Sequence, residues 1–177
     1  KYFKLAGGLV LRQEIVVGQR LRVWYKSANP KPDVPRYAAV VLLDSASAES
    51  LGGVDRFVRD GGGVVLAGDA SAARRVEPLI AWRALKREGA PIGTLPTDSA
   101  WRGLSRVPFD TLRDRRALAL ERRNGKLLVA ARRHYSGRVV GVGYDQTWRW
   151  RMMGGDEGPG QHGAWWSRVV GSVARGA

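Results

Sequence analysis

The chain has 177 residues, of which 44% are hydrophobic, a length that suits one domain with a buried core. It contains no cysteine, which excludes disulfides, thiolate metal sites and cysteine nucleophiles. Its formal net charge of +14 favours attraction to polyanions such as nucleic acid or anionic lipid head groups. The positive residues are scattered in pairs such as Arg74-Arg75 and Arg132-Arg133, a pattern typical of solvated faces rather than of a nucleic-acid-binding motif.

The first 36 residues carry only local signals. Residues 9–17 and 21–25 are rich in β-forming side chains and predict two strands, with a turn at Gly18-Gln19. Residues 27–36 contain three prolines and predict a loop. No apolar run in the chain reaches the length of a membrane span.

Residues 37–44 form a continuous apolar run that ends in an aspartate, as a strand buried on both faces of a parallel sheet does. Apolar residues at helical spacing follow, which predicts a helix capped by Ser47 or Ser50 and ended by the glycines at 61–63. Residues 64–67 predict a second buried strand. This β-α-β order indicates an α/β fold.

The middle of the chain predicts a helix over residues 72–88, disturbed at Pro78, and an irregular stretch over 90–110. Strands are then predicted over 117–121 and 126–131, joined at Asn124-Gly125, a strong hairpin signal. A third strand is predicted over 138–143. The sheet is therefore expected to be mixed, with its antiparallel portion near the C-terminus.

A final helix is predicted from about Gln161. Its apolar residues share one face and are expected to pack on the sheet: Trp165, Trp166, Val169, Val170 and Val173. Residues 158–163 fit the letters of the dinucleotide-binding pattern Gly-x-Gly-x-x-Gly, but no buried strand precedes them. We therefore interpret this segment as a flexible loop.

Aspartates follow three predicted strands, at Asp44 (beside Ser45), Asp69 and Asp145. In open α/β sheets the ligand crevice lies at the carboxyl ends of parallel strands, so these side chains are candidates for binding a small ligand or Mg²⁺, or for acid–base chemistry. The alternative is that Asp44 and Asp69 cap the helices after their strands. For Asp145 the strand direction is also open, because its strand can run either parallel or antiparallel to its neighbours.

A second candidate is the alternating segment 148–151. In a strand, Trp148 and Trp150 share one face and Arg149 and Arg151 the other, so the segment can stack on bases or sugars and clamp anions. In the alternative interpretation the tryptophans cover a sheet edge and the arginines are solvated.

Other catalytic motifs are missing from the sequence. The only histidines are His134 and His162, and there is no serine-hydrolase elbow, no Walker phosphate loop and no His/Glu metal pair. We therefore predict no metal site built on histidine and no cofactor.

Several segments together resemble the class I glutamine amidotransferase-like domains of bacterial membrane-anchored proteins, which often accompany von Willebrand A-type domains. These are residues 37–44, 58–68, 135–143 and 148–151, with Trp165-Trp166 in the last helix. The resemblance covers about residues 37–173. It implies a flavodoxin-like, three-layer α/β/α sandwich with a mostly parallel sheet, as one domain over 1–177 whose first 36 residues diverge. The first strand of that fold is then missing or remodelled.

The resemblance also implies membrane association through segments outside this chain, with other domains or subunits of that assembly as partners. Active members of the family use a cysteine and a His-x-Glu pair, which this chain lacks, so glutamine hydrolysis by that route is excluded. We therefore expect a non-catalytic binding or interaction domain. Two alternatives stay open: a metal- or small-ligand-dependent protein that uses the strand-end aspartates, and a polyanion-binding module.

Overall fold

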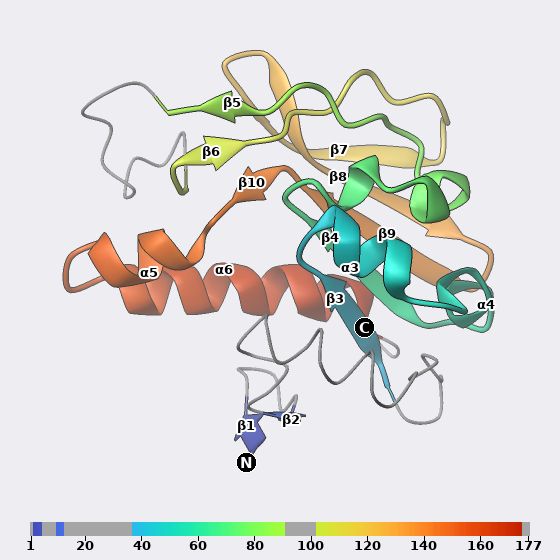
Figure 1. The fold of residues 1–177 in the computed structure, drawn as a ribbon, viewed down its shortest axis with the longest axis horizontal. Helices are drawn as coiled ribbons and strands as arrows, with labels where there is room; N and C mark the ends of the chain where they lie inside the picture. Colours follow the sequence, from blue (N-terminus) through green and yellow to red (C-terminus); the bar gives the residue numbers. More distant parts are fainter. Residues whose placement is uncertain (1, 5–9, 13–36, 91–101, 175–177) are drawn as a thin grey trace.

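The computed structural model describes residues 2–4, 10–12, 37–90 and 102–174 (Figure 1). Near the N-terminus, β1 (Tyr2–Lys4) and β2 (Val10–Arg12) form an antiparallel pair, and β2 lies within the first strand predicted there. The strand predicted over 21–25 and the loop predicted over 27–36 lie outside the described residues.

A five-stranded mixed sheet forms the centre of the described chain, with the strand order β3-β4-β9-β8-β7. Its strands are β3 (Ala39–Leu42), β4 (Gly63–Ala67), β7 (Ala117–Arg123), β8 (Lys126–His134) and β9 (Gly137–Val142). The first two and β9 run parallel, whereas β8 and β7 are antiparallel to their neighbours. The predicted α/β class and mixed sheet are confirmed. The strand before Asp145, β9, runs parallel to β4 and ends at Val142.

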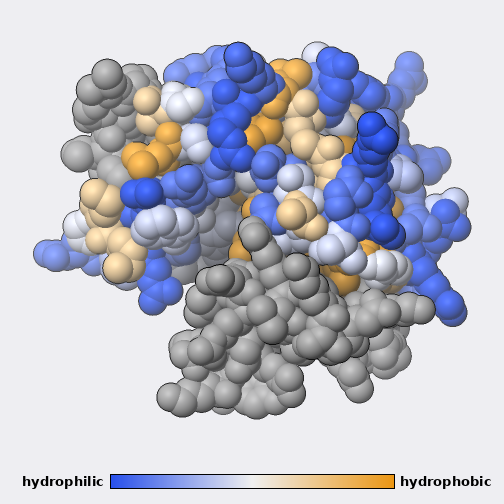
Figure 2. Space-filling model, in the orientation of Figure 1, coloured by the Kyte–Doolittle hydropathy of each residue, from blue (hydrophilic) through white to orange (hydrophobic). Residues whose placement is uncertain are grey.

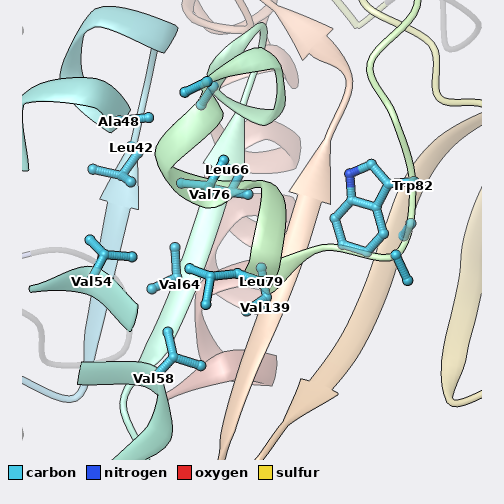
Figure 3. Close-up of a cluster of buried hydrophobic side chains, with 14 of the residues drawn as sticks. Leu42, Ala48, Val54, Val58, Val64, Leu66, Val76, Leu79, Trp82 and Val139 are labelled. Atoms are coloured by element: carbon cyan, nitrogen blue, oxygen red, sulfur yellow. The ribbon is translucent and has the colours of Figure 1, made fainter. Parts of the chain in front are cut away.

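Each face of the sheet carries its own core. On one face Leu42, Val64 and Val139 pack with buried residues from the helical segments after β3 and β4, as Figure 3 shows. On the other face Val65 and Val140 pack with the C-terminal helix α6 (Gly158–Val173), which Figure 1 shows running along the sheet. Because the strands are covered on both faces, their sequences read as continuous apolar runs.

The helix predicted after β3 is two short helices, α3 (Ser45–Ser50) and α4 (Val54–Arg59). Gly53, at φ +79°, separates them, a conformation that glycine adopts without steric cost. Capping by Ser47 or Ser50 was the wrong expectation, because Asp44 accepts the bond from the backbone N–H of Ser47.

The prediction of a helix over residues 72–88 is also wrong. The structure has two short 3-10 segments, η1 (Ala70–Ala72) and η2 (Arg74–Leu79, which contains Pro78), followed by extended chain. That chain bonds a distant segment instead of coiling on itself, since the N–H of Leu85 donates to the Pro108 carbonyl. Three short strands form a separate small sheet there in the order β10-β6-β5: β5 (Glu88–Gly89), β6 (Ser105–Arg106) and β10 (Tyr144–Asp145).

The hairpin between β7 and β8 is confirmed. Asn124 and Gly125 both have positive φ, +50° and +75°, as a two-residue type I′ turn requires. The last helix is confirmed too, but it begins at Gly158, so the loop expected over residues 158–163 is helical. In the described ranges, no helix has both the length and the apolar character needed to cross a bilayer.

Segment 148–151 is a helix rather than a strand. It opens α5 (Trp148–Met153), which packs on α6 through Trp150. The shared aromatic face was therefore a wrong expectation: Trp150 is buried, whereas Trp148 is 54% exposed.

Candidate functional site

The three predicted aspartates lie at the same edge of the sheet, where β3, β4 and β9 end. Asp44 caps α3, accepting bonds at Oδ1 from the Ser47 backbone N–H (2.6 Å) and hydroxyl (2.7 Å). Asp69 follows β4, and its Oδ1 accepts a bond from the backbone N–H of Ser45 at 3.0 Å. The capping interpretation therefore holds for Asp44, while Asp69 ties the end of β4 to the start of α3.

Arg87 joins Asp69 to Asp145. Its Nη2 lies 3.1 Å from Oδ2 of Asp69, and its Nη1 forms an ion pair with Asp145. The hydroxyl of Ser105 also donates to Oδ2 of Asp145 at 3.0 Å. We call Asp44, Ser45, Asp69, Arg87, Ser105 and Asp145 the strand-end cluster.

The strand-end cluster is partly open to solvent. The side chains of Arg87, Asp69 and Asp145 are 44%, 35% and 18% exposed. The cluster holds three carboxylates and one guanidinium, which pairs with two of them, so it is locally acidic on a protein whose net charge is +14. Such an arrangement offers both an anion-binding and a cation-binding group to a polar ligand.

The engagement of these carboxylates limits their chemistry. Both oxygens of Asp69 and both of Asp145 accept hydrogen bonds, and Arg87 lies between them in the place a cation would take. Among the residues that the structure describes, no three histidine, aspartate or glutamate side chains come together as a metal site. The Asp69 and Asp145 carboxylates are therefore held in place by donors on both of their oxygens.

Gly68 allows Asp145 to approach β4. It has φ +58°, and a Cβ on it would lie 3.2 Å from Oδ1 of Asp145. We expect Gly68→Ala to lower the free energy of unfolding by about 1–2 kcal/mol, because the left-handed backbone is strained and the new methyl group presses on the cluster. Chemical denaturation measures the free energy of unfolding. Gly89→Ala is the control, since a Cβ there meets nothing within 4 Å. Equal losses of stability in both variants would contradict the role of Gly68 in the approach of Asp145.

The tryptophan–arginine segment does not form the predicted binding surface. Arg149 stacks on Trp148, its guanidinium carbon 4.5 Å from the ring centroid, and Arg151 is exposed. Trp150 instead faces Trp165 of α6, with ring centroids 6.2 Å apart. Burial of one tryptophan against α6 selects the helix over the alternating strand.

The structure also shows an aromatic cage that the sequence did not reveal. The guanidinium of Arg102 lies over three rings, with centroid distances of 5.7 Å to Tyr144, 5.0 Å to Trp150 and 5.4 Å to Trp165. Glu121 pairs with Arg102 at 3.4 Å and accepts a bond from the Tyr144 hydroxyl at 2.7 Å. Burial and this hydrogen bond raise the pKa of Tyr144 to about 12, so the phenol stays protonated. No local pattern links these residues, which come from five separate segments.

Among the described residues, neither histidine has a hydrogen bond or ion pair with the strand-end cluster. His162, in α6, packs against Trp150, and burial with the nearby charge of Arg151 lowers its pKa to about 4. His134 lies 3.7 Å from Asp55, and burial followed by the charge of Arg132 lowers its pKa. Both pKa directions favour neutral rings at neutral pH.

Several arginines bond the protein's own backbone. Arg132 donates to the carbonyls of Pro78 and Ile80, and Arg138 donates to the Ser172 carbonyl. These arginines connect the sheet to the chain around residues 78–80 and to the end of α6. Some of the positive residues therefore stabilise the fold.

Comparison with known proteins identifies similar folds but no family. No protein-family model and no curated protein sequence matches the chain. A cytoplasmic protein of Salmonella typhimurium LT2 matches with a TM-score of 0.54 at 13% identity, over 79% of this chain and 73% of that one. A second cytoplasmic protein of Salmonella typhimurium matches with a TM-score of 0.57 at 14% identity, over 80% and 74%.

An exo-β-1,4-mannosidase from Opitutaceae bacterium strain TAV5 also matches, with a TM-score of 0.53 at 16% identity. The match covers 92% of this chain and 31% of the mannosidase, so this fold forms about a third of that larger protein. At such identities the likeness shows an α/β fold with a mixed sheet, and a shared fold does not imply a shared activity.

Proposed function

We propose that the chain is a non-catalytic binding domain that takes a polar small ligand at the strand-end cluster. The observation that carries the proposal is the bridge of Arg87 between Asp69 and Asp145. It gives the crevice edge of the sheet a guanidinium and carboxylates in fixed positions, and the chain has no cysteine to act as a nucleophile there. A ligand with both a carboxylate and an ammonium group is complementary to this set.

We further propose that the domain is a flavodoxin-like, three-layer α/β/α sandwich related to the class I glutamine amidotransferase-like domains. The helical segments on both faces of the sheet support this proposal, as does the placement of the candidate residues at the carboxyl ends of β3, β4 and β9. In this proposal the domain belongs to a larger membrane-anchored bacterial protein, held there by segments outside this chain, and its partners are other domains or subunits of that assembly.

The expected lack of glutaminase activity is tested by assaying glutamine hydrolysis with the purified protein. Because the chain contains no cysteine, we expect no more ammonia release than in a heat-denatured sample. Hydrolysis that persists after repeated purification, and that an Asp145→Asn substitution abolishes, would contradict the proposal and assign the cluster to catalysis.

A further inference from the structure

Exposed apolar side chains gather on one short helix. Of the large hydrophobic residues that are well exposed in the described chain, three lie in α5: Trp148 at 54%, Met152 at 72% and Met153 at 58%. The other exposed ones lie elsewhere in the fold: Leu43, Leu85, Leu118, Leu120 and Tyr135. Tryptophan and methionine are enriched in protein interfaces and depleted at ordinary surfaces, so this concentration indicates contact with a partner.

The α5 helix is held rigidly on α6. Trp150 is 5% exposed, and its ring lies 5.6 Å from His162 and 6.2 Å from Trp165, centroid to centroid. At the end of α5, Gly154 packs so closely that a Cβ there would lie 2.3 Å from the Trp150 carbonyl oxygen. The exposed side chains therefore project from a fixed base, which lowers the entropy lost when they bind.

The charges along α5 and the following turn are ordered. Arg149 and Arg151 lie in the helix, the apolar pair Met152 and Met153 follows, and the acidic residues 156–157 come after the turn. Within the part of the chain that the structure describes, neither Arg151 nor Asp156 forms an ion pair. Figure 2 shows pale orange and blue surface side by side at the left of the view, where Figure 1 places α5.

Along the helix axis this order is self-complementary, because the arginines lie within α5 and the acidic residues follow its end. We propose that the α5 surface, made of Trp148, Arg149, Arg151, Met152, Met153, Asp156 and Glu157, is a docking site for a second copy of this chain. Around a two-fold axis the same surface meets itself with the chain direction reversed. The arginines of each copy then face the acidic residues of the other, and the apolar residues meet in the middle.

The pairing is weak, because one short helix and its turn form less surface than the roughly 1,200–2,000 Å² of a standard interface. We expect a dissociation constant on the order of 10–100 µM. Sedimentation equilibrium over about 5–300 µM protein therefore shows a monomer that becomes a dimer as concentration rises. A wild-type chain that stays monomeric throughout would overturn the proposal.

Charge reversal makes the test specific. Arg149→Glu with Arg151→Glu makes the surface wholly acidic, and Asp156→Lys with Glu157→Lys makes it wholly basic. Each variant alone is expected to stay monomeric. An equal mixture of the two is expected to form a heterodimer, because opposite charges then face each other at both ends. Recovery in the mixture also shows that both variants are folded.

Leu118→Ser in the edge strand β7 is the matched control, since Leu118 is 61% exposed and lies outside α5. We expect it to dimerise like the wild type. Dimers that ignore the α5 charges, or that disappear with Leu118→Ser, would overturn the proposal in favour of pairing through β7. A wild-type monomer that binds vesicles of phosphatidylglycerol through Trp148 would instead assign the surface to a lipid bilayer.

Discussion

Replacing Arg102 by alanine is expected to lower the free energy of unfolding by about 3 kcal/mol, a large effect for a single side chain. The substitution removes a guanidinium whose side chain is 16% exposed and which lies within 5.7 Å of three ring centroids. It leaves a cavity among Tyr144, Trp150 and Trp165 and takes one arginine partner from Glu121. In a domain of this size the melting temperature falls by about 6–12 °C.

Arg123→Ala is the control for this result. Arg123 pairs with the same carboxylate, Glu121, at 3.0 Å, but its side chain is 37% exposed, and it meets the Tyr144 hydroxyl rather than lying over a ring. An exposed ion pair contributes about 1 kcal/mol or less. Thermal unfolding of both variants separates the contribution of the cage from that of the ion pair, and equal losses would show that the rings add nothing.

Acidification is expected to destabilise the protein through His162. Its pKa is about 4 in the folded protein, against 6.5 for an unperturbed histidine, so the unfolded chain binds the proton more tightly. The stability tied to the neutral ring is complete above pH 6.5 and declines as pH falls towards 4. Between pH 7.5 and pH 5 this amounts to about 2 kcal/mol.

The His162 Nε2 lies 3.3 Å from the Thr147 hydroxyl oxygen. The variant His162→Gln isolates the effect of titration, because glutamine keeps a polar group near Thr147 and does not titrate in this range. Urea unfolding at pH 7.5 and pH 5 is expected to show a smaller loss of stability on acidification in the variant than in the wild type, by about 2 kcal/mol. The variant retains His134, so any contribution of that ring cancels. Equal losses of stability between pH 7.5 and pH 5 in the two proteins would mean that His162 is not the group that titrates.

The parts of the fold that the sequence predicts correctly depend on local patterns. The apolar runs that form β3 and β4 need only burial on both faces, and the Asn124-Gly125 turn needs only two residues with positive φ. The position of Asp44 and Asp69 at one edge follows from the parallel direction of those two strands. Local sequence patterns are therefore enough to predict these features.

The parts that the sequence misses depend on contacts between distant segments. The Trp-Arg alternation at the start of α5 suits a strand, and only the burial of Trp150 against Trp165 favours a helix. The segment that contains Arg87 reads as a helix, but its backbone bonds lead to residues 104–110. Arg87 pairs with Asp145, 58 positions later in the sequence, so no sequence periodicity predicts that Arg87 lies in the strand-end cluster.

The most direct test of the proposed function is the melting temperature of the wild-type protein with glutamine, other amino acids, sugars, nucleotides, Mg²⁺ and short DNA, each measured beside Asp69→Asn. A ligand at about 100 times its dissociation constant stabilises the folded state by about 2.7 kcal/mol. We predict that an amino acid raises the melting temperature, that Asp69→Asn abolishes the shift, and that Asp60→Asn, at an exposed ion pair with Arg56, retains it. A panel without any shift, a shift that survives in Asp69→Asn, or a shift with DNA alone that salt removes would contradict a small-ligand site at the strand-end cluster.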